Sequence, residues 1–180
     1  MLSIFVPPVD SWDEEREEFV HFPGKRLQLE HSLVSLSKWE SIWQKPFLSK
    51  TKEPKTLEET ISYIKCMTIT QNVSPETYRY LTSDNFEAIN NYIDAPMTAT
   101  TFNDQGKSGN EVITSEIIYY WMISFNIPFE CQKWHLNRLI TLIKVCSIKN
   151  QPQKKMSNRQ ILANNARLNE ARRKALHTKG

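Results

Sequence analysis

Cys131 and His135 come closer than any other pair in this chain to a reactive or metal-binding arrangement. They are four residues apart, so on a helix they would share a face, the spacing at which two side chains reach one metal ion, with Cys146 as a conceivable third ligand. A zinc site of this kind needs a second paired element such as CxxC or HxxxH, which the sequence lacks. A thiolate nucleophile would need an oriented third group, and none is recognisable. We therefore expect Cys131 to pack in the core and His135 to hydrogen-bond a buried partner.

Other catalytic signatures are missing from the sequence. It contains no Gly-rich phosphate loop, GxSxG, HExxH or DxDxDG, and only four glycines in all. The acidic run at residues 13–18 has no second carboxylate cluster to match it, so we interpret it as solvated surface. The three cysteines are widely spaced in apolar surroundings, which suits reduced core residues. We predict a protein that is not an enzyme and that needs no cofactor or metal.

Four of the five tryptophans are candidate partner-binding residues: Trp39, Trp43, Trp121 and Trp134. Aromatic side chains dominate the hot spots of protein interfaces. At helical spacing, however, they more often form the core of a domain. The sequence leaves both interpretations open, and solvent exposure decides between them.

Positive charge is concentrated at the C-terminus. Residues 151–180 contain eight Lys or Arg and one acid and so carry +7, whereas the first 150 residues contain 15 bases and 19 acids and carry −4. A basic tail could neutralise phosphates of a nucleic acid, but no aromatic residues are interleaved, and a protein-binding or solubilising tail fits at least as well. The candidate partner-binding residues in this tail are Arg159, Arg167, Arg172 and Arg173.

The segment from Thr114 to Cys146 carries the most apolar and aromatic surface at helical spacing, and we expect the rest of the chain to be organised around it. It predicts a helix capped by Thr114 or Ser115, a break at residues 126–128, and a second helix whose buried stripe runs from Phe129 to Cys146. Because the connection is short, the two helices should pack as an antiparallel hairpin.

Further helices are predicted by spacing and by capping residues. Apolar residues three to four apart predict a helix over residues 32–43, and Thr56 with Glu59 forms a capping-box pattern before the next one. Ser74 followed by Pro75 marks a third helix start. Ser83 or Asp84 should cap a fourth helix that ends before Pro96, and another is expected from Ser157 towards Leu176.

Extended segments are expected mainly at the N-terminus. Short strands are predicted around residues 2–6, 18–22 and 26–30, with Leu27 and Leu29 on one face of the last. The charged stretch WDEEREE between the first two should be a turn or a helical stub. Residues 97–102 could add a further strand, and residues 104–110 form a polar, mobile loop.

Together these elements predict an α+β, predominantly helical fold, in which a small N-terminal antiparallel sheet packs on a helical core with a central helical hairpin. We expect one globular domain over residues 1–150 and a basic, helical extension over residues 151–180. The longest apolar run, residues 117–123, is far shorter than the ~20 residues that cross a membrane. No basic segment precedes the first apolar residues, so we do not expect a secretory signal. We therefore expect a cytoplasmic location.

Three stretches of the sequence resemble the tail assembly chaperone family of tailed bacteriophages. They are LEHSLVSLSKWESIWQKPF (29–47), ITSEIIYYWMISFNIPFECQKWHLNRLITLIKVC (113–146) and KKMSNRQILANNARLNEARRKALHTKG (154–180). The resemblance implies a non-enzymatic protein of the host bacterial cytoplasm that binds the tape measure protein, keeps it soluble and helps tail tube protein polymerise around it. It also implies a longer form made by ribosomal frameshifting near the C-terminus, and it assigns no individual site residue.

Self-association would suit such a chaperone, and two other classes of protein share its features. A virion structural component of the neck or tail would have the same helix-rich core but would stay in the mature particle. A nucleic-acid-binding protein would depend on the basic tail and would bind less tightly as salt increases. No membrane partner is expected, and nucleic acid is the least favoured of these partners.

Overall fold

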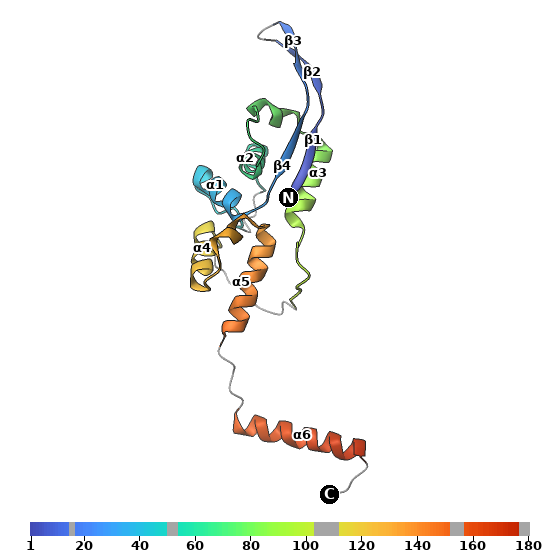
Figure 1. The fold of residues 1–180 in the computed structure, drawn as a ribbon, viewed down its shortest axis with the longest axis vertical. Helices are drawn as coiled ribbons and strands as arrows, with labels where there is room; N and C mark the ends of the chain where they lie inside the picture. Colours follow the sequence, from blue (N-terminus) through green and yellow to red (C-terminus); the bar gives the residue numbers. More distant parts are fainter. Residues whose placement is uncertain (15–16, 50–53, 103–111, 152–156, 177–180) are drawn as a thin grey trace. The chain divides into compact units, whose positions relative to one another are not determined.

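The computed structural model describes residues 1–14, 17–49, 54–102, 112–151 and 157–176 (Figure 1). The chain divides into two compact units, Met1–Ser147 and Ile148–Gly180. The fold is predominantly helical, with short antiparallel strand pairs at the N-terminus, which confirms the predicted α+β class. The loop expected at residues 104–110 lies outside the described residues.

Four strands form an N-terminal ribbon in two consecutive antiparallel pairs: β1 (Leu2–Val6) with β4 (Lys25–Leu29), and β2 (Val9–Asp13) with β3 (Glu18–Phe22). Pro7 and Pro8 separate the pairs on one side, because proline has no N–H for the ladder. Gly24 separates them on the other, with φ +75° and a position so close to Val6 O that a Cβ atom would lie 3.0 Å from it. This conformation favours glycine.

Strand β2 corrects one prediction. The beginning of the charged stretch, Trp12 and Asp13, is in β2 and not in a turn or helical stub. Trp12 pairs with Phe19 across the ladder, and their rings pack edge to face with centroids 5.0 Å apart. Both of these side chains are exposed. Polar and charged residues are therefore compatible with this strand, since the pair is not part of the buried core.

The β1–β4 pair has one buried face. Ile4 and Val6 on β1 lie on the same face as Leu27 and Leu29 on β4, whereas Phe5, between the two buried β1 residues, is exposed. This alternation confirms the predicted inward leucines. Helix α3 (Ser83–Asp94) packs against β1.

Helices α1 (Leu33–Trp43) and α2 (Leu57–Met67) pack side by side and contribute much of the core. Thr56 and Glu59 form the predicted capping box at the start of α2, with Glu59 N donating to Thr56 Oγ1 (3.1 Å) and Thr56 N donating to Glu59 Oε2 (2.9 Å). The largest fully buried side chains of the unit are Trp39, Leu27, Leu29, Leu33, Leu36, Ile64, Met67, Ile89, Ile118, Met122, Leu136 and Leu139.

The next two segments partly follow the prediction. Ser74 and Pro75 begin a short 3₁₀ helix, η1 (Pro75–Tyr80). Helix α3 (Ser83–Asp94) is capped by Thr82, whose Oγ1 accepts from Asn85 N at 3.3 Å, and not by Ser83 or Asp84. The described residues 97–102 form no strand, so the predicted addition to the sheet is wrong.

The predicted helical hairpin consists of three helices: α4 (Ser115–Ser124), the 3₁₀ helix η2 (Phe129–Lys133) and α5 (Leu136–Asn150). The predicted second helix is interrupted at Trp134 and His135, because Leu136 N donates to His31 O (2.7 Å) and His135 forms a bridge with Ser32. Phe129 is therefore exposed and not part of a buried stripe. Helix α4 packs mainly on α1, and not as one arm of a closely paired hairpin.

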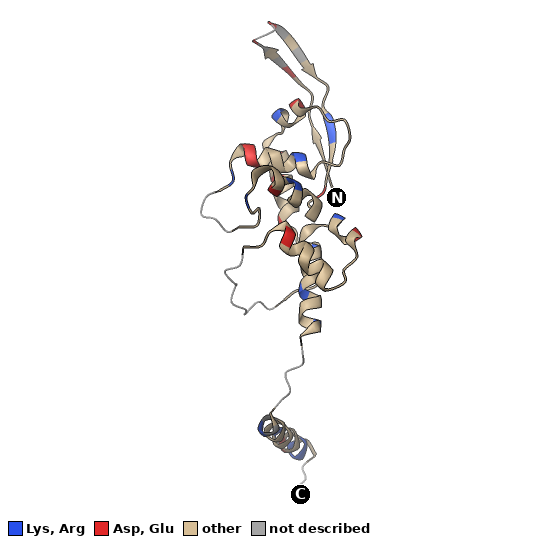
Figure 2. Cartoon of the chain, turned by 90° about the vertical axis from the view of Figure 1, so that its left-hand side faces the viewer, with Lys and Arg blue, Asp and Glu red and all other residues tan. Residues whose placement is uncertain are grey.

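The second unit contains helix α6 (Asn158–Leu176), which begins where the sequence predicts a helix. Ser157 O accepts from Ile161 N at 3.0 Å in its first turn. From residue 161 to residue 176 every side chain of α6 is exposed. Figure 2 shows the concentration of Lys and Arg on this helix.

Candidate partner-binding groove

Trp39 is a core residue. Its side chain is 2% exposed, and its indole Nε1 donates to Glu59 O at 2.9 Å. The ring also packs edge to face against Phe47, with centroids 5.1 Å apart. This buried hydrogen bond joins α1 to the first turn of α2, so the core interpretation holds for this tryptophan.

Trp43 lies one turn further along α1, and its ring forms part of a shallow surface groove. The indole Nε1 donates to Ser62 Oγ at 2.9 Å, and the ring is partly buried. Because the polar N–H is already bonded within the protein, the exposed part of the ring adds apolar surface to the groove.

The groove runs between the end of α1 and the first turns of α2 and has a volume of about 540 Å³. Four apolar side chains line it together with three polar ones: Ile42, Trp43, Leu57, Ile61, Glu58, Ser62 and Lys65. Ile42 is 63% exposed and Leu57 is 67% exposed. Such exposure of two large aliphatic side chains beside an indole ring is typical of a surface that binds a partner.

The groove has a rigid floor because two indole hydrogen bonds, from Trp39 and Trp43, join α1 to α2. Lys45 Nζ lies 2.8 Å from Glu59 Oε1 and ties the segment after α1 to the α2 capping box. The hydrogen bond from Lys45, together with that from Thr56 N, lowers the pKa of the Glu59 carboxyl. The two helices therefore present their apolar side chains at a fixed separation.

The other candidate tryptophans lie elsewhere. Trp121 on α4 is half-buried and packs against the core. Trp134 is half-buried between η2 and α5, and Arg138 Cζ lies 4.3 Å from its ring centroid. Of the four tryptophans, Trp43 is the one that lines the groove. The candidates Arg159, Arg167, Arg172 and Arg173 are all exposed on α6, in the second unit.

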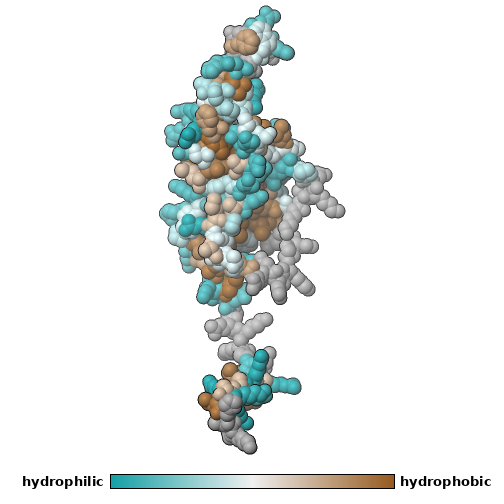
Figure 3. Space-filling model, turned by 90° about the vertical axis from the view of Figure 1, so that its right-hand side faces the viewer, coloured by the Kyte–Doolittle hydropathy of each residue, from teal (hydrophilic) through white to brown (hydrophobic). Residues whose placement is uncertain are grey.

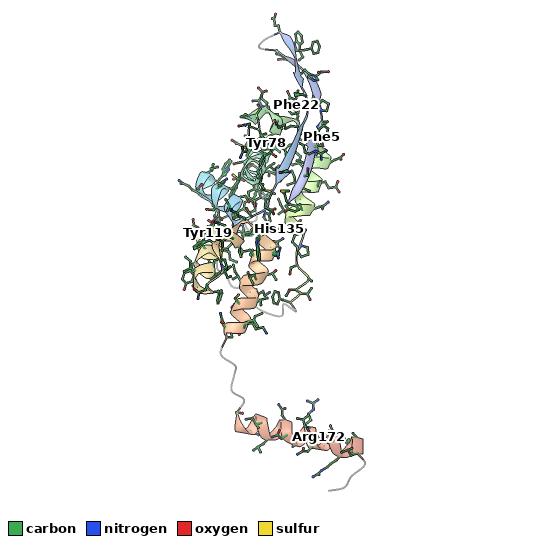
Figure 4. All side chains as sticks on the ribbon, in the orientation of Figure 1. Phe5, Phe22, Tyr78, Tyr119, His135 and Arg172 are labelled. Atoms are coloured by element: carbon green, nitrogen blue, oxygen red, sulfur yellow. The ribbon has the colours of Figure 1, made fainter. Side chains whose placement is uncertain are left out.

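Cys131 and His135 are not on one helix face, because η2 ends between them. Cys131 is buried. His135 Nδ1 accepts from Asn137 N (3.3 Å), so Nε2 carries the proton and donates to Tyr92 O (2.9 Å). The predicted roles, packing for the cysteine and a buried hydrogen bond for the histidine, are confirmed. His135 lies at the start of α5 (Figure 4).

Two buried residues that sequence reasoning did not single out organise the same region. His31 Nδ1 lies 2.6 Å from Tyr63 Oη, and its ring packs on His135 with centroids 5.0 Å apart. Burial, and secondarily the neighbouring His135, lowers the pKa of His31 to about 4. Glu40 accepts from Phe47 N (2.9 Å) and from Ser115 N (2.7 Å). The signal in the sequence was Glu40 itself, a charged residue within the apolar stripe of its helix.

The contacts described above are packing contacts and hydrogen bonds around one apolar groove. Among the described residues, no group of three or more His, Cys, Asp and Glu side chains could hold a metal ion. No helix in the described part of the chain has the length and apolar character needed to span a membrane. No known protein family, curated protein or solved structure gives a significant match to this chain.

Proposed function

We propose that this protein is a tail assembly chaperone of a tailed bacteriophage, and that the α1–α2 groove receives a helical segment of the tape measure protein. The observation that carries the proposal is the groove itself: exposed Ile42 and Leu57 beside Trp43, on a floor fixed by indole hydrogen bonds. An apolar groove between two helices suits the apolar stripe of an amphipathic helix. The resemblance of residues 29–47, which include α1, to the chaperone family supports the same assignment.

The size of the groove fits a chaperone that must release its client. Its apolar lining is four side chains, and each large side chain that becomes fully buried contributes about 1.5–3 kcal/mol. Much of that gain is offset by the translational and rotational freedom that the partners lose. Such a contact keeps an apolar helix from aggregating and still allows tail tube protein to replace the chaperone.

Co-expression with the tape measure protein of the same phage tests the proposal, with Ile42→Asp as the variant. An aspartate in the groove should reduce client binding at least about tenfold, because it opposes burial of the client's apolar stripe. The tape measure protein should then become insoluble, as it should in the absence of the chaperone. Equal solubility of the tape measure protein with and without the wild-type chain would refute the proposal.

Ile123→Asp is a matched control. Ile123 lies near the end of α4, as Ile42 lies near the end of α1, and the two side chains are 61% and 63% exposed. The control variant should keep the client soluble. If both variants fail equally, the effect is not specific to the groove. Mass spectrometry of purified virions addresses the structural alternative, since a stoichiometric amount of this chain in the particle would indicate a neck or tail component.

A further inference from the structure

Helix α6 is an amphipathic cationic helix without buried side chains over residues 161–176. It has 19 residues, and in proteins a helix gains most of its stability by packing its apolar face against another surface. Five Lys or Arg and one Glu give it a charge of +4. Figure 3 shows apolar surface beside hydrophilic surface on this helix.

The apolar residues of α6 include a seven-residue spacing. Ile161, Leu168 and Ala175 are seven apart, and Asn164 and Ala171 occupy the alternate core positions of the same heptads. This is the spacing of a coiled-coil seam, in which a single polar residue is commonly used to fix the register. Ile161 is 43% exposed and Leu168 is 55% exposed, so no described residue of the second unit buries the seam.

The positive charges have a definite relation to this seam. Arg167, Arg172 and Lys174 occupy the positions that flank the core positions in each heptad, whereas Arg159 and Arg173 lie on the opposite side of the helix (Arg172 is labelled in Figure 4). In a coiled coil, the flanking positions select the partner by charge. Glu170 does not compensate the flanking arginines, because its carboxylate pairs with Lys174 on the same helix at 2.8 Å.

These positions favour one kind of partner. Two copies of α6 would bring like charges together along the seam, which opposes self-pairing. A nucleic acid would neutralise the charges but would leave Ile161 and Leu168 uncovered, and α6 offers no aromatic side chain for stacking. We propose that α6 pairs through this seam with an amphipathic helix of another protein that carries Glu or Asp at its own flanking positions. This site is separate from the α1–α2 groove and does not depend on the client assigned to the groove.

Charge reversal tests the proposal on the full chain. The probe is a synthetic heptad peptide with Leu in the seam and Glu at the flanking positions, and fluorescence anisotropy measures its binding. Arg167→Glu with Arg172→Glu should weaken binding by about tenfold or more, because repulsion replaces two attractive contacts. Arg159→Glu with Arg173→Glu changes the net charge equally but lies off the seam, and should weaken binding less than about threefold. A Lys-flanked peptide should bind the first double variant more tightly than it binds the wild type.

A second pair of variants tests the apolar part of the seam. Leu168→Asn lies in the seam and should weaken binding of the Glu-flanked peptide by about tenfold, whereas Leu162→Asn, outside it, should have little effect. Thermal unfolding of each variant checks that the first unit is intact. These changes should leave tape measure solubility unaffected, and Ile42→Asp should leave peptide binding unaffected, so failure of one proposal can be distinguished from failure of the other.

Several outcomes would overturn the inference. Equal loss of binding in both arginine double variants would show that only net charge matters, and equal binding of a peptide with the same composition in scrambled order would show the same. Tighter binding of duplex DNA than of the Glu-flanked peptide, unaffected by Leu168→Asn, would assign α6 to nucleic acid. Dimers in sedimentation equilibrium that dissociate on Leu168→Asn would assign the seam to a second copy of this chain.

Discussion

At the scale of single residues, Glu40 shows how a charged side chain can be structural. Glu40 is 8% exposed, and its carboxylate accepts hydrogen bonds from the backbone N–H groups of Phe47 and Ser115. The second bond caps the start of α4, where Thr114 makes no side-chain cap bond. A negative charge is favourable at that end of a helix. Glu40 thus joins α1, the segment that follows it and α4.

Glu40→Gln should therefore destabilise the fold by about 2–3 kcal/mol. The amide keeps one oxygen, but its NH₂ group faces a backbone N–H, so one buried donor loses its acceptor. Urea unfolding followed by circular dichroism measures the change. Glu87→Gln, on the exposed side of α3, is the control and should change the free energy of unfolding by less than about 0.5 kcal/mol. Similar small effects of both substitutions would contradict the role given to Glu40.

At the scale of elements, the histidine pair joins segments that are far apart in the sequence. His31 follows β4, its ring contacts Tyr63 of α2 and His135 before α5, and its carbonyl accepts from Leu136 N. His135 in turn donates to the carbonyl of Tyr92 in α3. Among the described residues, neither ring is paired with a carboxylate by a hydrogen bond. Both are therefore suited to the neutral form, and burial lowers the pKa of each.

This arrangement predicts acid sensitivity. The pKa of His31 is about 4 in the folded protein and about 6.5 in the unfolded chain, so the unfolded state binds more protons between these values. The contribution of neutral His31 is complete above pH 6.5 and falls by about 3 kcal/mol as the pH falls towards 4. His135 acts in the same direction. Urea unfolding at a series of pH values should show this loss in the wild type.

His31→Gln should flatten that pH dependence, even though it destabilises the protein at neutral pH. His21→Gln is the matched control, because His21 lies on β3 and its side chain is exposed; its slope should follow that of the wild type. If His31→Gln loses stability towards acid as steeply as the wild type, the buried histidine is not the cause. The slope of stability against pH is the informative readout, since a purely structural loss would lower the free energy of unfolding by the same amount at every pH.

The sequence predicted the elements that depend on local contacts and missed the one that depends on the long-range contact with His31. The Thr56–Glu59 capping box and the inward leucines of β4 depend on neighbours a few residues away, and both predictions are correct. The interruption between η2 and α5 depends on a hydrogen bond from Leu136 N to His31 O, across more than a hundred residues of chain. Local periodicity cannot report such a contact, and so it predicted one continuous helix.

The candidate site was predictable in part for the same reason. Trp39 and Trp43 are equivalent in a sequence pattern, since both fall on the apolar stripe of one helix. Only the packing of α2 distinguishes them. Trp39 is buried and bonds to Glu59 O, whereas Trp43 lies at the surface and bonds to Ser62 Oγ. The arginines of the tail were likewise found as a group, and the position of each relative to the apolar seam depends on the continuous helix α6.

At the scale of the whole molecule, stability and net charge belong to different parts of the chain. The buried apolar residues all lie in the first unit, Met1–Ser147, as far as the structure describes the chain. The C-terminal 30 residues carry a charge of +7, and the first 150 residues carry −4, which gives the net charge of +3. Removing them should therefore change the sign of the charge and leave the free energy of unfolding unchanged within about 0.5 kcal/mol.

A chain that ends at Asn150 tests this division. It should unfold at the urea concentration of the wild type, and it should bind an anion exchanger near neutral pH because residues 1–150 carry −4. It should also lose the Glu-flanked peptide while it keeps the tape measure protein soluble, since the groove lies on α1 and α2. A loss of more than about 1 kcal/mol of stability would instead mean that the tail supports the fold. The effect of losing the tail's charge could then not be distinguished from damage to the groove, because a less stable fold would also disturb the packing of α1 on α2.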